Sequence, residues 1–122
     1  MRIHIDFNSD EAIYIQLRNQ IVLGIAREQL HDGESLPSVR QLAEELGVNM
    51  HTVNKAYAML RQEGYLLMDR RRGAVVHIEV QNQPMDSLNM AMKLMVAEAI
   101  CRDIAVEELQ QIIHDMYLEF DD

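Results

Sequence analysis

Apolar residues in the first thirty positions follow two different spacings. The first set alternates with polar residues and comprises Ile3, Ile5 and Phe7. Alternation of this kind predicts a short strand or an extended entry to the fold. The second set recurs at every fourth position and comprises Ile13, Leu17, Ile21 and Ile25. Because this spacing places the apolar side chains on one helical face, a helix is expected over about residues 11–29.

Two shorter helical patterns follow, and a glycine separates them. The apolar positions of the first pattern are Val39, Leu42, Ala43 and Leu46. Ser38 can cap this helix after Pro37, and Gly47 can end it. Asn49 is a good cap for the second helix, which is expected to end at Gly64. The residues that this second helix is expected to bury are Val53, Ala56, Tyr57 and Leu60.

Two β-rich runs come next, over residues 65–69 and 74–80. The segment between them, Arg70-Arg71-Arg72-Gly73, predicts a hairpin with a basic tip. Three arginines are unusual in a turn, and only Gly73 favours one. A polar stretch at 81–85 contains Pro84 and is expected to be a linker. The pattern therefore divides the chain into residues 1–80 and 81–122.

The tail after the linker carries two further helical patterns. The first is marked by Leu88, Met92, Met95, Val96 and Ile100, and the second by Leu109, Ile112, Ile113, Met116, Tyr117 and Phe120. Two helices cannot enclose a core, so these apolar stripes need a partner. One partner is the chain's own N-terminal part. The other is a second copy of the chain in a two-fold four-helix bundle, and we expect this dimer. The methionines of the tail also suit a small hydrophobic effector pocket.

Composition limits the protein class without naming a function. The 122 residues carry a net charge of −9, and no apolar run reaches the roughly 18 residues that a membrane span needs. The N-terminus lacks the pattern of a signal peptide, so a cytoplasmic protein that joins the nucleoid when bound is expected. A single cysteine, Cys101, excludes an internal disulfide. It is either a redox sensor or an idle thiol.

The negative charge is concentrated in the tail. Residues 1–80 hold 9 Lys and Arg against 11 Asp and Glu, whereas residues 81–122 hold 2 against 9. Within 35–75 the balance is reversed, with 6 basic and 4 acidic residues. Because salt screens charges beyond about 8–10 Å, this local positive field decides what the segment can bind. An acidic tail would stay away from a polyanion and direct the basic part towards it.

The order of the elements points to DNA. Helix, glycine turn, helix and hairpin is typical of a winged helix-turn-helix, in which the second helix enters the major groove. Apolar burial leaves Met50, His51, Asn54 and Lys55 on the open side of that helix. Asn can pair with adenine and Lys with guanine, and the Met50 side chain can pack on a thymine methyl.

Other residues are suited to the phosphate backbone. Arg40 falls in the first turn of the preceding helix, and the Thr52 hydroxyl either binds a phosphate or has a structural role. The arginines of the hairpin tip suit a phosphate strand or the minor groove, although such a tip can also be merely solvated. The candidate DNA-binding residues are Ser38, Arg40, Met50, His51, Thr52, Asn54, Lys55, Arg70, Arg71, Arg72 and Gly73.

The residues from about Asp10 to Val80 resemble the DNA-binding domain of the GntR family of bacterial transcription regulators. The matching residues are Gly33-Glu34, Leu36-Pro37-Ser38-Val39-Arg40, Gln41-Leu42-Ala43, Leu46-Gly47-Val48-Asn49, Thr52-Val53, Lys55-Ala56-Tyr57, Leu60, Gly64-Tyr65 and Arg72-Gly73. The resemblance implies DNA contacts from Arg40, from the start of the recognition helix, and from Gly73 with its neighbour Arg72.

The short tail is similar to that of the YtrA-like subgroup, whose two C-terminal helices serve dimerisation. Genes of this subgroup often lie beside ABC-transporter genes, so the resemblance implies such an operon as the target. The entry segment from Glu11 to Leu17 is also similar, except that Ala12 stands where proline is usual. The wing departs as well, with Ala74-Val75-Val76 in place of a run like Thr-Phe-Val.

We therefore expect a mostly α-helical protein with a small β-hairpin wing, in which a winged helix-turn-helix is followed by a two-helix dimerisation bundle. The expected function is a homodimeric transcription regulator, a repressor, that binds an inverted repeat in double-stranded DNA. The alternative is a winged-helix docking module that binds protein. The sequence contains no catalytic cluster, no metal-ligand spacing and no cofactor motif, and it identifies no effector. We do not expect an enzyme.

Overall fold

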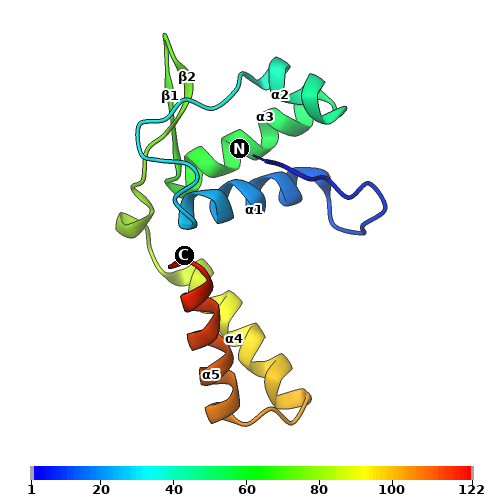
Figure 1. Ribbon diagram of the computed structural model, residues 1–122, viewed down its shortest axis with the longest axis vertical. Helices are drawn as coiled ribbons and strands as arrows, with labels where there is room; N and C mark the ends of the chain where they lie inside the picture. Colours follow the sequence, from blue (N-terminus) through cyan, green and yellow to red (C-terminus); the bar gives the residue numbers. More distant parts are fainter. Residues whose placement is uncertain (1, 122) are drawn as a thin grey trace. The chain divides into compact units, whose positions relative to one another are not determined.

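The computed structural model describes residues 2–121, which form two compact units. The first unit extends to Gln83 and the second begins at Pro84. Figure 1 shows helices with a β-hairpin in the first unit and a pair of helices in the second. The boundary predicted between residues 80 and 81 falls at the short 3₁₀ helix η1, Val80–Asn82.

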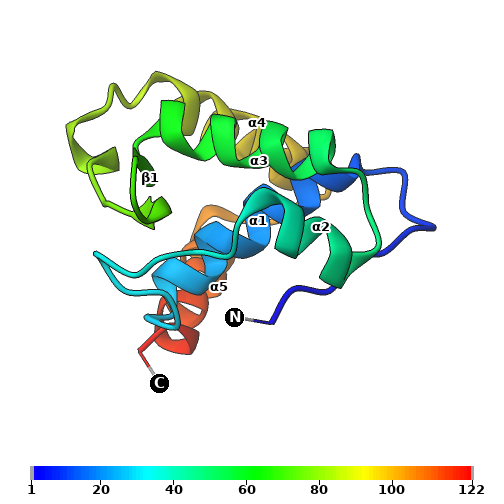
Figure 2. The same ribbon diagram turned by 90° about the horizontal axis from the view of Figure 1, so that it is seen from above.

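Three helices build the first unit: α1 (Ile13–Ala26), α2 (Val39–Leu46) and α3 (Met50–Glu63). Figure 2 shows α1 and α3 running alongside each other, with α2 packed against α3. Ser38 caps α2, and its Oγ accepts a hydrogen bond from the Gln41 N–H at 3.1 Å. The turn to α3 requires Gly47, whose φ of 70° is the left-handed conformation that residues with a Cβ rarely adopt.

The hairpin consists of β1 (Leu66–Asp69) and β2 (Gly73–Val76), which pair antiparallel with Leu66 opposite Val76. Residues 33–36 run along the other edge of β2. The Leu36 N–H donates to the Ala74 carbonyl at 2.8 Å, and Ser35 bridges Val75. The loop between α1 and α2 is therefore hydrogen-bonded to the hairpin. We call the hairpin of β1 and β2 the wing.

One core joins the helices to the wing. It includes the residues that the second short helix was expected to bury: Val53, Ala56, Tyr57 and Leu60. The entry segment also contributes to it through Ile5, whereas Phe7 is exposed. Gln16 is buried and binds the main chain of Asp6 in both directions: its Oε1 accepts from the Asp6 N–H, and its Nε2 donates to the Asp6 carbonyl.

Some predicted bounds were too long. The helix expected over 11–29 begins at Ile13 and ends at Ala26, because Leu30 folds back and its N–H donates to the Gly24 carbonyl. Of the two alternatives predicted for residues 3–7, a short strand or an extended entry, the strand is absent, since side-chain amides of α1 take backbone hydrogen bonds of this segment. The run expected over 74–80 forms a strand only to Val76.

The second unit is a helical hairpin of α4 (Asp86–Cys101) and α5 (Val106–Glu119). Ala99 is its only buried residue among those described. Large apolar side chains remain exposed on both helices, including Leu88, Ile100, Met116 and Tyr117. This unit does not enclose a core of its own.

Candidate nucleic-acid interface

Helix α3 has one buried face and one open face. Val53, Ala56, Tyr57 and Leu60 are buried, whereas the four candidate base readers are exposed: Met50, His51, Asn54 and Lys55. Thr52 is half-buried. The helix starts with the cap that the sequence predicted, because Asn49 Oδ1 accepts a hydrogen bond from the His51 N–H at 2.7 Å.

A tyrosine of α3 fixes the start of α2. The Tyr57 hydroxyl donates to the main-chain carbonyl of Pro37 at 2.8 Å. Burial, and then the nearby carboxylate of Glu45, raise the pKa of Tyr57 well above its ordinary value, so the hydroxyl remains a donor even in alkaline solution. The bond positions the segment that holds the cap Ser38 and the exposed Arg40.

Lys55 has an aromatic partner on another helix, which was not predicted from the sequence. Its Nζ lies 4.0 Å from the centre of the Tyr14 ring, a cation–π contact between α3 and α1. Tyr14 is half-buried, and Lys55 remains exposed. The residues are 41 positions apart, so no helical spacing could have indicated the pair.

Asp69 organises the tip of the wing. Its Oδ1 accepts hydrogen bonds from the main-chain N–H groups of Arg71 and Arg72, at 2.8 and 3.1 Å. These bonds, the first of them most strongly, lower the pKa of the Asp69 carboxyl below its ordinary value. Gly73 completes the turn with a φ of 74°. The side chain of Asp69 therefore compensates for three arginines that are poor turn residues.

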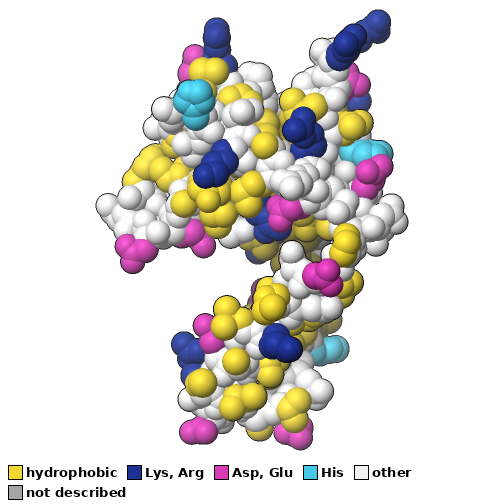
Figure 3. Space-filling view, turned by 180° about the vertical axis from the view of Figure 1, so that it is seen from behind, with side chains coloured by type: hydrophobic (Ala, Val, Ile, Leu, Met, Phe, Trp, Pro, Cys, Tyr) yellow, Lys and Arg dark blue, Asp and Glu magenta, His cyan; other side chains and the backbone are white. Residues whose placement is uncertain are grey.

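The three wing arginines have different surroundings. The guanidinium of Arg72 is bent towards the loop between α1 and α2, where its Nε donates to Ser35 Oγ at 3.1 Å and its Nη2 donates to the Gly33 carbonyl. All three are exposed. Figure 3 views the side on which α3 lies and shows dark blue side chains at the wing tip and over the first unit. Among the described residues, the guanidinium groups of Arg70 and Arg71 have no hydrogen bond of the kind that Arg72 makes with the loop.

A bidentate ion pair fixes the other end of α3. The Arg18 guanidinium on α1 donates to both carboxylate oxygens of Glu63, at 3.0 and 3.1 Å. The same guanidinium lies 5.7 Å from the centre of the Tyr65 ring. Because both partners come from the scaffold, Arg18 helps to hold α3 against α1 and is not part of the open face.

The predicted dimerisation residues fall into two groups. Three of them are half-buried within the hairpin: Leu109, Ile113 and Phe120. The other eight are exposed: Leu88, Met92, Met95, Val96, Ile100, Ile112, Met116 and Tyr117. Met90 and Leu94, which are not among the predicted residues, are exposed as well, on the opposite side of α4 from Leu88 and Met92.

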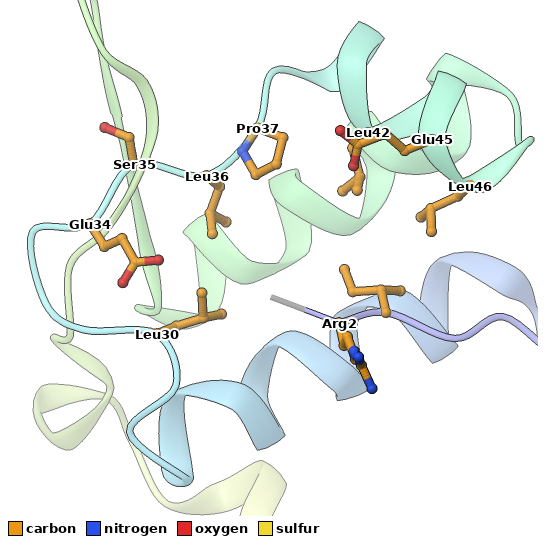
Figure 4. Close-up of a pocket in the computed structure, with 10 residues that line it drawn as sticks. Arg2, Leu30, Glu34, Ser35, Leu36, Pro37, Leu42, Glu45 and Leu46 are labelled. Carbon is orange, nitrogen blue, oxygen red and sulfur yellow. The ribbon is translucent and has the colours of Figure 1, made fainter.

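A cavity of about 370 Å³ lies in the first unit, between the entry segment, residues 30–37 and α2. Figure 4 shows leucine side chains on its walls, with the carboxylates of Glu34 and Glu45 at two sides. None of the residues that line it belongs to the methionine-rich tail. Residues 2–121 contain no group of three His, Cys, Asp or Glu side chains placed to hold a metal ion. No helix in that range is long and apolar enough to cross a membrane.

Comparisons with known proteins agree on one family. The profile described as "Bacterial regulatory proteins, gntR family" matches residues 10–76. YhcF of Bacillus subtilis, an uncharacterized HTH-type transcriptional regulator, is 30% identical over 80% of this chain and 79% of that protein. The HTH-type transcriptional repressor YtrA of B. subtilis is 29% identical over 93% of this chain and 91% of its own. Among solved structures, YtrA from Sulfolobus acidocaldarius, a GntR-family transcription factor, is 42% identical with a TM-score of 0.66, covering 78% of this chain and 97% of that one.

Proposed function

The chain belongs to the gntR family of bacterial regulatory proteins and is a DNA-binding transcription regulator. We propose that it is a repressor that binds an inverted-repeat operator as a homodimer. The observation that carries the proposal is the pairing of an open recognition helix with a helical hairpin on which eight of the eleven candidate dimerisation residues are exposed.

The DNA-binding face is assembled within the first unit. The exposed start of α3 would enter the major groove, where Asn54 has the donor and acceptor that adenine requires. Arg40 at the start of α2, with Arg70 and Arg71 at the wing tip, would neutralise phosphates on either side of the groove. These charges would supply most of the affinity, so binding should weaken steeply as salt rises.

The second unit would provide the two-fold axis. A helical hairpin with exposed apolar side chains on both helices is destabilised in water unless another surface covers them. Pairing two such hairpins into a four-helix bundle buries these side chains. The two-fold symmetry closes the assembly, so no further copies are added. A dimer of this kind would present two recognition helices to half-sites about 34–36 Å apart, or a multiple of that spacing.

Repression and the target operon complete the proposal. One relative that aligns over about nine-tenths of both chains, YtrA of B. subtilis, is a transcriptional repressor. A dimer bound to an operator represses transcription when it prevents other proteins from binding the same DNA. We also propose an ABC-transporter operon as the target, as the resemblance to the YtrA-like subgroup implies.

The test combines DNA binding with oligomeric state. Fluorescence anisotropy would follow full-length protein binding to labelled DNA from upstream of its own gene, at several salt concentrations, with a scrambled duplex as control. The expected result is nanomolar binding that prefers the native duplex, with a footprint over an inverted repeat. Light scattering should give twice the chain mass of 14.1 kDa. Absence of binding even at low salt would reject this function and favour a protein-docking module.

A further inference from the structure

The lysine of the recognition helix has a defined position without DNA. The ammonium of Lys55 lies 4.0 Å from the centre of the Tyr14 ring, and Tyr14 belongs to α1. The ring is half-buried and packs against the core, so it is held in place, whereas the lysine is exposed. The ring covers one side of the ammonium and leaves donors free for a second partner.

The ammonium of Lys55, unlike its backbone, lies at the border of the open face on the side of α1. Successive residues of a helix are about 100° apart around its axis, so the Cα–Cβ bond of Lys55 points almost directly away from the buried residues of α3. The contact with Tyr14 bends the rest of the side chain towards α1 and brings the ammonium to the border of the open face. When a helix lies in the major groove, side chains in the middle of its open face meet base edges, and those at its borders meet the phosphate walls.

We propose that Tyr14 is a positioning residue that pre-orders Lys55 for a phosphate of the operator backbone, so that Lys55 contributes affinity and not base recognition. The proposal rests on the proposed operator binding. It revises the expectation that Lys55 pairs with guanine. A free lysine loses rotamer freedom when it binds, and the aromatic contact removes part of that loss in advance.

A double-mutant cycle on the full-length protein tests this role. Operator binding would be measured by anisotropy at several salt concentrations for the wild type, Lys55→Ala, Tyr14→Leu, and the two substitutions combined. Tyr14→Phe is the matched control, since it keeps the ring and removes only the hydroxyl. Each variant would also be tested on operators with single base-pair changes, and its thermal unfolding would be compared with that of the wild type.

We expect Lys55→Ala to weaken binding to every duplex by the same factor and to lower the salt slope by about one. Tyr14→Leu should weaken binding about two- to fivefold, the factor that corresponds to an exposed cation–π contact. It should have no further effect when Lys55 is already alanine. Tyr14→Phe should bind like the wild type. In the free protein, the side-chain methylene protons of Lys55 should show a ring-current shift that Tyr14→Leu abolishes and Tyr14→Phe retains.

Two results would overturn the inference and leave the proposed function standing. One is a loss of discrimination at a single base pair in Lys55→Ala, which would make Lys55 a base reader. The other is an equal effect of Tyr14→Leu with and without Lys55, which would make Tyr14 a structural residue only. A wild-type protein that does not prefer its operator would overturn both proposals.

Discussion

The Tyr57 hydroxyl on α3 and the Pro37 carbonyl before α2 are joined by a hydrogen bond of 2.8 Å. The bond links the two helices of the helix-turn-helix from outside the turn itself. Its donor is a residue of the buried face of α3, and its acceptor precedes the cap Ser38 by one residue. The position of Arg40 relative to the recognition helix therefore depends on a side chain that cannot itself reach DNA.

Replacing Tyr57 with phenylalanine should destabilise the protein while its ring still fills the core. A hydrogen bond of this kind contributes about 0.5–1.5 kcal/mol, and the Pro37 carbonyl would lose its partner. For a domain of this size a loss of 1 kcal/mol lowers the melting temperature by about 4–8 °C. Circular dichroism at fixed protein concentration measures the change. Tyr65→Phe, which keeps the ring beside Arg18, is the control, and equal melting of the two variants would contradict the role of the bond.

Replacing Arg40 and replacing Asn54 with alanine should weaken DNA binding in different ways. Arg40→Ala removes a proposed phosphate contact, so binding should weaken on all sequences and the salt slope should fall by about one. Asn54→Ala removes a proposed base contact, which should cost about 1–3 kcal/mol on the preferred base pair and little on others. Anisotropy titrations on operator and single-site variants separate the two patterns.

Arg102→Ala is the matched control for these titrations, because it removes one exposed positive charge from the second unit. It should change operator binding much less than Arg40→Ala does. If Arg40→Ala and Asn54→Ala both bind like the wild type, the assigned face is wrong.

Local signals in the sequence were enough to predict the helix-turn-helix. Ser38, Gly47, Asn49 and Gly64 are the caps of α2 and α3 in the structure, because each cap is satisfied by backbone groups within a few residues. The hairpin was also predicted, since the turn before Gly73 is a local feature. The end of α1 was not, because Leu30 turns the chain back onto Gly24 to reach the core.

The surroundings of the candidate site residues depended on contacts that spacing cannot reveal. Arg72 binds Ser35, which is 37 positions earlier, and Lys55 lies on Tyr14 from another helix. Both lysine and arginine were assigned from chemistry alone, as charges available to DNA. Which of these charges already has a partner depends on tertiary packing. The packing of the loop against the wing gives Arg72 its partner, and the packing of α1 against α3 gives Lys55 its partner.

Acidification should loosen the tip of the wing. The pKa of Asp69 in the folded protein is lowered by the Arg71 and Arg72 N–H groups, so the stabilisation is complete above the unfolded value of about 3.9 and is lost as pH falls through the folded value. Amide resonances of Arg71 and Arg72 should therefore titrate with a midpoint below that of an ordinary aspartate. Asp69→Asn keeps an oxygen acceptor and should remove the titration. A midpoint at or above the ordinary value would show that these bonds are not held in solution.

A charge placed on the apolar face of α5 should separate the proposed dimer. Met116 is 52% exposed in the single chain, so Met116→Glu leaves the packing inside the hairpin largely intact. In a four-helix bundle the same carboxylate would be buried without a partner, which costs several kcal/mol. Light scattering should then give a mass near 14.1 kDa, and the preference for an inverted repeat over a half-site should be lost with the bivalency. Gln111→Glu adds the same charge on the polar side of α5 and should remain dimeric. If Met116→Glu keeps both the dimer mass and the preference for the inverted repeat, the second unit does not pair through this face.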